Sequence, residues 1–151
     1  MKCFLISLTV LFISIIASPQ TTEDSIKATI NTLFDAMKTG DAFLFKTVFS
    51  DSAVLQTISR NKDGKTEVVS ESIDEFAAFV GKLKKDSADE RISFETIKID
   101  GPLAIAWTPY NFYYNGAFSH CGVNSFQLVR LEGKWKIQYL IDTRRKAGCQ
   151  P

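Results

Sequence analysis

The sequence predicts an α+β domain in which N-terminal helices cover one face of an antiparallel sheet. Apolar residues recur at helical spacing through much of the first half of the chain, whereas segments that suit strands dominate from residue 91 onward. Two tight-turn signals, Asn115-Gly116 and Glu132-Gly133, divide the aromatic-rich C-terminal part into consecutive strands. The length of 151 residues accommodates one ordinary domain but not two.

Residues 1–18 have the layout of a secretory signal peptide. A short basic start at Met1-Lys2 precedes a nearly continuous apolar run over residues 4–17, which is shorter than the ~20 residues that span a membrane. Small residues place the cleavage site between Ala17 and Gln20. We therefore expect a secreted or periplasmic protein. A retained N-terminal anchor is the alternative, because bulky residues precede the cleavage site.

Removal of this segment leaves a domain at residues 22–146 and a C-terminal tail at 147–151. The loss of Lys2 leaves 17 basic and 17 acidic residues, a balance that gives no electrostatic case for nucleic-acid binding or for an anionic membrane surface. A single histidine and the lack of an acidic cluster argue against a metal site. The sequence also has no Gly-rich phosphate loop and no serine-centred nucleophile elbow. We expect no cofactor.

Two helices are predicted at the start of the domain. Thr21 and Thr22 offer N-caps for the first, and Gly40 ends it in the position of a C-terminal glycine. Asp41 caps a short second helix. One apolar stripe follows the helical period in the first helix: Ile26, Ile30, Leu33, Phe34 and Met37.

A hairpin and a third helix follow. Strands at 53–58 and 66–69 flank a turn at 61–64, and a capping box at 72–75 begins a helix that continues to Leu83. The remaining chain predicts four strands, at residues 92–99, 103–114, 118–131 and 134–142.

The two tight turns allow the register of the last three strands to be calculated. If both are two-residue turns, Tyr114 pairs with Ala117 and Leu131 pairs with Lys134. The two calculations agree on the residues that share the helix-covered face: Leu103, Ile105, Trp107, Asn124, Phe126, Leu128, Trp135, Ile137, Tyr139 and Ile141. A slip of one residue would move this set to the other face.

The opposite face then holds Cys121, Asp142 and Arg144, unless a bulge reverses the alternation. A bulge is expected near Pro109, because proline cannot donate to a ladder.

The run from Trp107 to Arg145 resembles the secreted SnoaL-like or lumazine-binding-like branch of the nuclear transport factor 2-like (NTF2-like) superfamily. The motifs are W-x-x-Y at 107–110, G-x-x-S-H-C-G at 116–122, G-x-W-K-I at 133–137 and D-T-R-R at 142–145. The order of elements is also similar. The resemblance implies a cone in which the helices and a strongly curved sheet enclose a pocket, and it implies homodimers packed through the sheet. It does not transfer a reaction, because members include isomerases, cyclases, dehydratases and binding domains.

Polar and aromatic side chains near the open end of this sheet are the candidate site. His120 has an ordinary pKa close to neutral and suits a general acid or base. Asp142 would orient it if a bulge brings both to one face, and a structural histidine at a strand end is the alternative. The candidate ligand-binding residues, chosen for ring stacking and for polar contacts, are Trp107, Tyr110, Tyr113, His120, Asn124, Tyr139 and Arg144.

Cys121 cannot easily act with His120, because adjacent strand residues point to opposite faces. After export, Cys121 and Cys149 either form a disulfide or stay separate thiols, and the sequence leaves both open.

These features favour a secreted NTF2-like protein that binds a small apolar or aromatic molecule. An isomerase, cyclase or dehydratase that uses His120 and Asp142 is the first alternative. A structural module, with a filled core and a sheet that mediates dimerisation, is the second.

Overall fold

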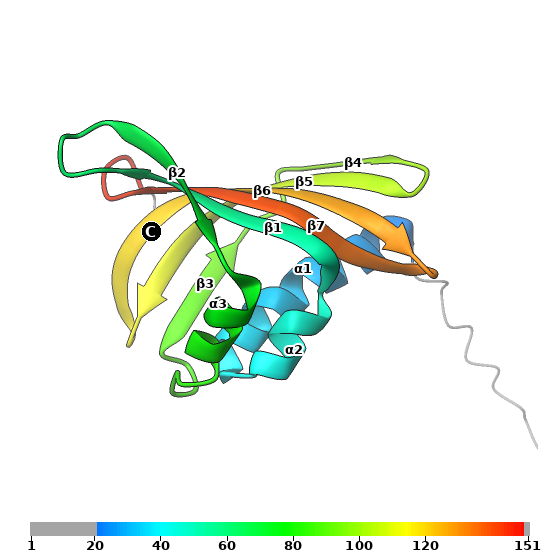
Figure 1. Cartoon of the computed structure of the whole chain (residues 1–151), viewed down its shortest axis with the longest axis horizontal. Coiled ribbons are helices and arrows are strands. Elements are labelled where there is room, and N and C mark those ends of the chain that lie inside the picture. Colours follow the sequence, from blue (N-terminus) through cyan, green and yellow to red (C-terminus); the bar gives the residue numbers. More distant parts are fainter. Residues whose placement is uncertain (1–20, 150–151) are drawn as a thin grey trace, which may run out of the picture.

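The computed structural model describes residues 21–149. The predicted signal peptide and the last two residues of the predicted tail lie outside this range. Over the described residues, three helices pack beneath one large, curved and unclosed sheet (Figure 1). The predicted α+β class is therefore confirmed. None of these helices is long and apolar enough to cross a membrane.

The first helix, α1 (Thr22–Thr39), forms where local signals predict it. Thr21 and Asp24 make a reciprocal capping box, and Gly40 closes the helix at φ 73°, a conformation that glycine adopts without steric cost. Its apolar stripe is buried against the sheet, where the Phe34 ring meets Phe126 edge-on at 6.3 Å between centroids.

The other two helices are short. Asp41 caps α2 (Ala42–Thr47), and Ser72 caps α3 (Ile73–Val80) through its hydroxyl. The third helix ends before the predicted limit at Leu83, because the chain turns at Gly81 after only two helical turns.

The sheet has the strand order β2-β1-β7-β6-β5-β3, and β4 also pairs with β5. The strands are β1 (Phe49–Arg60), β2 (Thr66–Glu71), β3 (Ala88–Ile92), β4 (Thr96–Asp100), β5 (Leu103–Tyr114), β6 (Ala117–Leu131) and β7 (Lys134–Arg145). All pairs are antiparallel except β1 with β7, which run parallel.

Residues 92–99 form two strand segments and not the single strand that was predicted. The cause is Pro109, whose carbonyl oxygen accepts from Ser93 N at 2.9 Å. A residue in an antiparallel ladder directs its N–H and its C=O to the same neighbouring strand. The missing proline N–H therefore faces this side of the sheet, at the point where β3 ends and β4 has not begun.

Both hairpin turns pair as predicted, Tyr114 with Ala117 and Leu131 with Lys134. Each hairpin contains a bulge, and the calculated register holds from the turn to the bulge but is wrong by one residue beyond it. On β6 the extra residue is Ser119, and on β7 it is Gln138. The bulge expected near Pro109 is present on the other side of β5, where the register shifts by one residue between the pair Ile92–Tyr110 and the pair Thr96–Trp107.

The two bulges reverse part of the predicted inner face. The residues predicted to face the helices that lie on the outer face instead are Leu103, Ile105, Trp107, Tyr139 and Ile141. The inner face holds Ala104, Ala106, Thr108, Tyr110, Leu140 and Asp142 in their place, all of them buried. The predicted inward positions of Asn124, Phe126, Leu128, Trp135 and Ile137 are confirmed, and each is buried.

Candidate ligand-binding cavity

A cavity of about 230 Å³ lies between the helices and the inner face of the sheet. The helices supply an apolar wall: Leu33, Phe34, Met37, Phe45, Phe76, Phe79 and Val80. The strands supply a polar end: Glu71, Glu90, Tyr110, His120, Asn124, Asp142 and Arg144. An apolar protein cavity of ~150 Å³ holds benzene, so this volume suits a molecule of one or two rings.

The mouth of the cavity is aromatic. Phe79 on α3 is 53% exposed and Tyr114 on β5 is 47% exposed, although both line the cavity. The interior is closed by buried side chains, including Phe45 on α2 and Tyr110 on β5. A ligand that enters past the aromatic mouth therefore exchanges water for an apolar wall and one polar end.

Tyr110, Asp142 and Arg144 form the centre of the polar end. The Tyr110 hydroxyl lies 3.2 Å from Asp142 Oδ2 and 2.9 Å from the Thr143 carbonyl oxygen, and it can donate to one of them at a time. Arg144 Nε donates to Asp142 Oδ2 at 3.0 Å. Burial and the Asp142 charge raise the pKa of Tyr110, so its hydroxyl remains a donor.

Arg144 is held by two carboxylates. Besides Asp142, its Nη2 lies 3.7 Å from Glu71 Oε1 on β2. Burial alone would lower the pKa of Arg144, but the charge of Asp142, its hydrogen bond and the charge of Glu71 together outweigh burial and raise that pKa. The guanidinium is thus a permanent cation whose charge is already compensated within the protein.

Gly122 makes this arrangement sterically possible. A Cβ at this position would lie 1.7 Å from the Thr143 carbonyl oxygen and 2.7 Å from Tyr110 Cε1. Only a residue without a side chain leaves room for Tyr110 to cross β6 and reach Asp142 on β7. This gives the glycine in the S-H-C-G motif a structural reason.

Glu90 on β3 is the second feature of the polar end. Asn124 Nδ2 donates to Glu90 Oε1 at 2.8 Å. Burial raises the pKa of Glu90 to about 7, and the nearby Asp142 charge acts in the same direction, against the Asn124 hydrogen bond. This carboxyl is therefore close to half ionised at neutral pH, which is unusual for glutamate.

Sequence reasoning missed both Glu90 and Glu71. Glu90 was overlooked because the strand region was taken to begin at Arg91. Glu90 lies two residues before Ile92 and four before Phe94, and both of these pack against the core. Alternate residues of a strand share a face. A predicted strand that began three residues before Arg91, at Ala88, would have placed Glu90 on the inner face.

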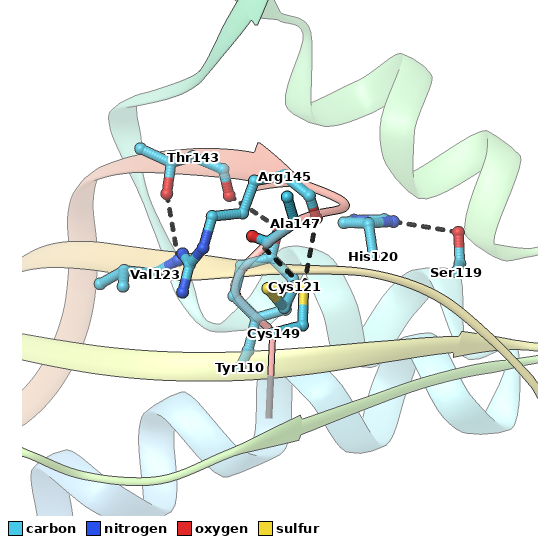
Figure 2. Close-up of a disulfide and its surroundings, with 9 residues drawn as sticks. All are labelled: Tyr110, Ser119, His120, Cys121, Val123, Thr143, Arg145, Ala147 and Cys149. Atoms are coloured by element: carbon cyan, nitrogen blue, oxygen red, sulfur yellow. Dashed lines mark hydrogen bonds between the residues drawn. A yellow bond between two sulfur atoms is a disulfide. The ribbon is translucent and has the colours of Figure 1, made fainter. Parts of the chain in front are cut away.

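His120 lines the cavity but does not contact Asp142. Its Nδ1 lies 3.0 Å from the Ser119 hydroxyl, and its ring packs against Tyr110 and Phe112. The contact between His120 and Ser119 is drawn in Figure 2. Burial lowers the pKa of His120, and the Arg144 charge adds to this effect, so the imidazole is neutral at pH 7. Within residues 21–149 no hydrogen bond joins it to Asp142, whose Oδ2 is engaged by Tyr110 and Arg144.

Cys121 and Cys149, which the sequence left open, form a disulfide with 5.7 Å between Cα atoms. Figure 2 shows the C-terminal segment after β7 folded back over the strands to reach Cys121. The bridge occupies the Cys121 thiol and so excludes the cysteine as a nucleophile beside His120.

Three predicted ligand-binding residues lie outside the cavity. Trp107 is 45% exposed on the outer face. The Tyr139 hydroxyl donates to Gln56 Oε1 at 2.8 Å on the same face. The Tyr113 ring lies under the Arg91 guanidinium at 4.0 Å. Trp107 and Tyr139 were misplaced because the bulges reverse the alternation. The predicted residues that the structure brings to the cavity are Tyr110, His120, Asn124, Asp142 and Arg144.

In the described part of the chain, no three potential metal ligands of the histidine, cysteine and carboxylate types come together. The site consists of hydrogen-bonding groups and aromatic walls.

Residues 21–139 match the protein family described as "Putative lumazine-binding". A comparison with proteins of curated function gives no match. Among solved structures, an NTF2-like protein of unknown function from Shewanella baltica is 17% identical with a TM-score of 0.63, covering 83% of this chain and 94% of that chain. An NTF2-like protein of unknown function from Silicibacter pomeroyi is 20% identical with a TM-score of 0.64, covering 83% and 99%.

A domain of unknown function with a cystatin-like fold from Nostoc punctiforme is also similar, at 20% identity and a TM-score of 0.64, covering 85% of this chain and 81% of that chain. Identities this low establish a shared fold and no shared activity. Because the family match spans most of the chain, and because the solved structures share its NTF2-like fold, the chain belongs to the "Putative lumazine-binding" family.

Proposed function

We propose that this protein is an exported binding protein for a small molecule of one or two rings, held in the cavity beneath the sheet. The observation that carries the proposal is the cavity itself, about 230 Å³ with an apolar helical wall and polar groups gathered at one end. The family name points to lumazine, a fused two-ring heterocycle with a polar edge, which has the size and the mixed character that such a cavity suits.

The unfilled volume argues against a purely structural module. In a protein interior that only supports the fold, side chains pack at crystal-like density and leave few voids larger than a water molecule. Here aromatic side chains surround the open space without filling it.

Export is the second part of the proposal. It rests on the signal-peptide layout of residues 1–18 and is supported by the Cys121–Cys149 disulfide, since such bridges persist mainly in oxidising compartments. Cell fractionation, with N-terminal sequencing of the recovered protein, tests it. Recovery from the cytoplasm of a protein that still begins at Met1 would contradict export.

Pairing of two chains through the outer face of the sheet is the third part. Leu103, Ile105 and Trp107 are each more than 40% exposed on β5 and form an apolar strip on that face. Contiguous apolar surface of this kind marks interaction sites. Sedimentation of the mature protein and of an Ile105→Lys variant tests the pairing. The variant is expected to shift toward monomer.

Ligand binding is tested with the mature protein, a thermal-shift library of one- and two-ring compounds, and native mass spectrometry. A ligand at a hundredfold excess over its Kd raises the free energy of unfolding by about 2.7 kcal/mol. Phe76→Trp on α3 adds bulk to the cavity wall, whereas Phe43→Trp adds the same bulk at an 80% exposed position on α2. Loss of binding in Phe76→Trp alone supports the cavity as the binding site. Equal binding by the two variants excludes the cavity as that site.

Acid–base catalysis is a second candidate, favoured by one observation. The Glu90 carboxyl has its pKa raised to about 7, near the value at which a general base works best at neutral pH. The Tyr110 hydroxyl stays protonated, and it would donate to a developing oxyanion after releasing its hydrogen bond to Asp142 or Thr143. Glu90 suits the role of base better than the predicted pairing of His120 with Asp142, because those two make no mutual hydrogen bond. If turnover is found, Glu90→Gln should abolish it in a folded protein, and undiminished turnover would exclude the role.

A further inference from the structure

The polar end of the cavity carries more negative than positive groups. Three carboxyl side chains line it, Glu71, Glu90 and Asp142, against one guanidinium, Arg144. The remaining basic side chain there, His120, has its pKa lowered and is uncharged at neutral pH. An anionic ligand would therefore enter a region that is already acidic.

Arg144 does not offset this negative charge for an anionic ligand. Its Nε donates to Asp142 Oδ2 at 3.0 Å and its Nη2 lies 3.7 Å from Glu71 Oε1. A ligand carboxylate or phosphate would have to compete with two protein carboxylates for the same guanidinium. Arg144 is one of the ligand-binding residues predicted from the sequence, and its two carboxylate partners make it a poor site for an anionic ligand.

Glu90 is the group with unused binding capacity. Asn124 satisfies its Oε1, whereas no hydrogen bond to its Oε2 and no ion pair to either oxygen is present among residues 21–149. Protein encloses the side chain, but it keeps some accessible surface and lines the cavity. An enclosed carboxylate without a cationic partner gains most from a ligand that supplies one.

From these contacts we propose that the cavity selects ring compounds whose polar edge carries an N–H donor, above all a protonated amine or amidine, which binds Glu90, and that it disfavours carboxylates and phosphates. The proposal rests on the small-molecule-binding function proposed above and narrows its ligand class. Tyr110 and Phe112, on the neighbouring strand, also line the cavity, and aromatic rings stabilise a cation that lies over them.

Binding of such a cation is coupled to the protonation of Glu90. The ionised carboxylate accepts from the ligand, so a bound cation favours loss of the Glu90 proton, and affinity rises as pH increases from about 5.5 to 8. The charged or titratable groups around Glu90 that share in this response are Glu71 on β2, Tyr110 on β5, His120 on β6, and Asp142 and Arg144 on β7.

The test uses three naphthalene probes of similar size and different charge: 2-naphthylmethylamine, 2-naphthoate and 2-ethylnaphthalene. Binding to the mature protein is measured by calorimetry at pH 7.5. The amine is expected to bind at least tenfold more tightly than the carboxylate. Glu90→Gln is expected to weaken the amine at least tenfold while changing the neutral probe less than twofold. The exposed Glu95→Gln substitution is the matched control and should change neither.

The outcomes separate this inference from the function on which it rests. If the carboxylate or the neutral probe binds as tightly as the amine, or if Glu90→Gln leaves amine binding unchanged, the selectivity is refuted and the binding function stands. If no probe and no library compound binds, both proposals fail. Circular dichroism of the Glu90→Gln variant establishes that it folds, so a loss of amine binding can be assigned to the carboxylate.

Discussion

Glu90→Gln should make the protein more stable, and the gain should grow with pH. In the folded protein, burial raises the pKa of Glu90 from an ordinary value of 4.5 to about 7. The folded state therefore holds this proton more tightly than the unfolded state does. The stabilisation from the protonated carboxyl is complete below about pH 4.5 and is lost as pH rises through about 7. Glutamine keeps a similar shape and an acceptor for Asn124, but it cannot ionise.

The magnitude follows from the two pKa values. Because the unfolded state ionises more readily than the folded state, the raised pKa of Glu90 lowers the free energy of unfolding, relative to a side chain that cannot ionise, by about 1 kcal/mol at pH 5 and by about 3 kcal/mol at pH 8. The difference in unfolding free energy between Glu90→Gln and the parent protein should thus widen by about 2.5 kcal/mol over this range. Access of water to the cavity reduces the figure, so a widening of 1 kcal/mol or more fits the reasoning.

Urea unfolding followed by circular dichroism at pH 5, 6, 7 and 8 measures this difference directly. Titration of other groups largely cancels, because the comparison is between two proteins that differ at one side chain. Glu95→Gln, which removes an exposed carboxylate, should keep a constant offset from the parent protein. If the difference in unfolding free energy between Glu90→Gln and the parent protein stays constant or shrinks as pH rises, the account of Glu90 as an enclosed, unpaired carboxyl is refuted.

Three further substitutions test other parts of the structure. Cys149→Ser opens a covalent loop across a sequence separation of 28 and should lower the free energy of unfolding by about 2–4 kcal/mol, with a melt that no longer responds to reductant; an unchanged melt would deny the bridge. Gly122→Ala forces a Cβ into the Thr143 carbonyl and should lose at least about 2 kcal/mol, whereas Gly64→Ala, strained at φ 76° but free of neighbours, should lose about 1 kcal/mol in the same urea titration. Trp135→Ala should lose about 3–5 kcal/mol and Trp107→Ala much less at a dilution that keeps the protein monomeric; equal losses would favour the uninterrupted register.

The features that were predictable from the sequence have local causes. The capping box at Thr21, the glycine at residue 40 and the Asn115-Gly116 turn each act within a few residues of themselves, so the sequence contains all the information needed. The same holds for the pairing beside each turn, where Tyr114 meets Ala117 in the structure as calculated.

The bulges were not predictable in this way. Ser119 and Gln138 are ordinary strand residues, and no turn chemistry marks either as the extra residue. The second bulge, at Gln138, is held by contacts that are distant in sequence. The Gln138 side chain accepts from the Ser50 hydroxyl at 2.7 Å and donates to the Ser52 carbonyl on β1, so the bulge in β7 depends on a strand some 90 residues earlier. The agreement between the two calculated registers did not show that either was correct, because both calculations assumed uninterrupted strands.

The bulges are also what creates the site. Without them, the inner face would carry Leu103, Ile105 and Trp107 from β5 where the structure places the small side chains of Ala104, Ala106 and Thr108.

On β7 the exchange is chemical as well as steric. Ile141 would point inward in place of Asp142, and Arg144 would leave the cavity. The carboxylate that holds both Tyr110 and Arg144, and whose charge helps to raise the pKa of Glu90, reaches the inner face only because Gln138 adds one residue to its strand. One inserted residue in each hairpin thus brings Tyr110 from β5, and Asp142 and Arg144 from β7, to the polar end of the cavity. A sequence that retained every residue type but lost either bulge would remove Tyr110, or Asp142 and Arg144, from that end.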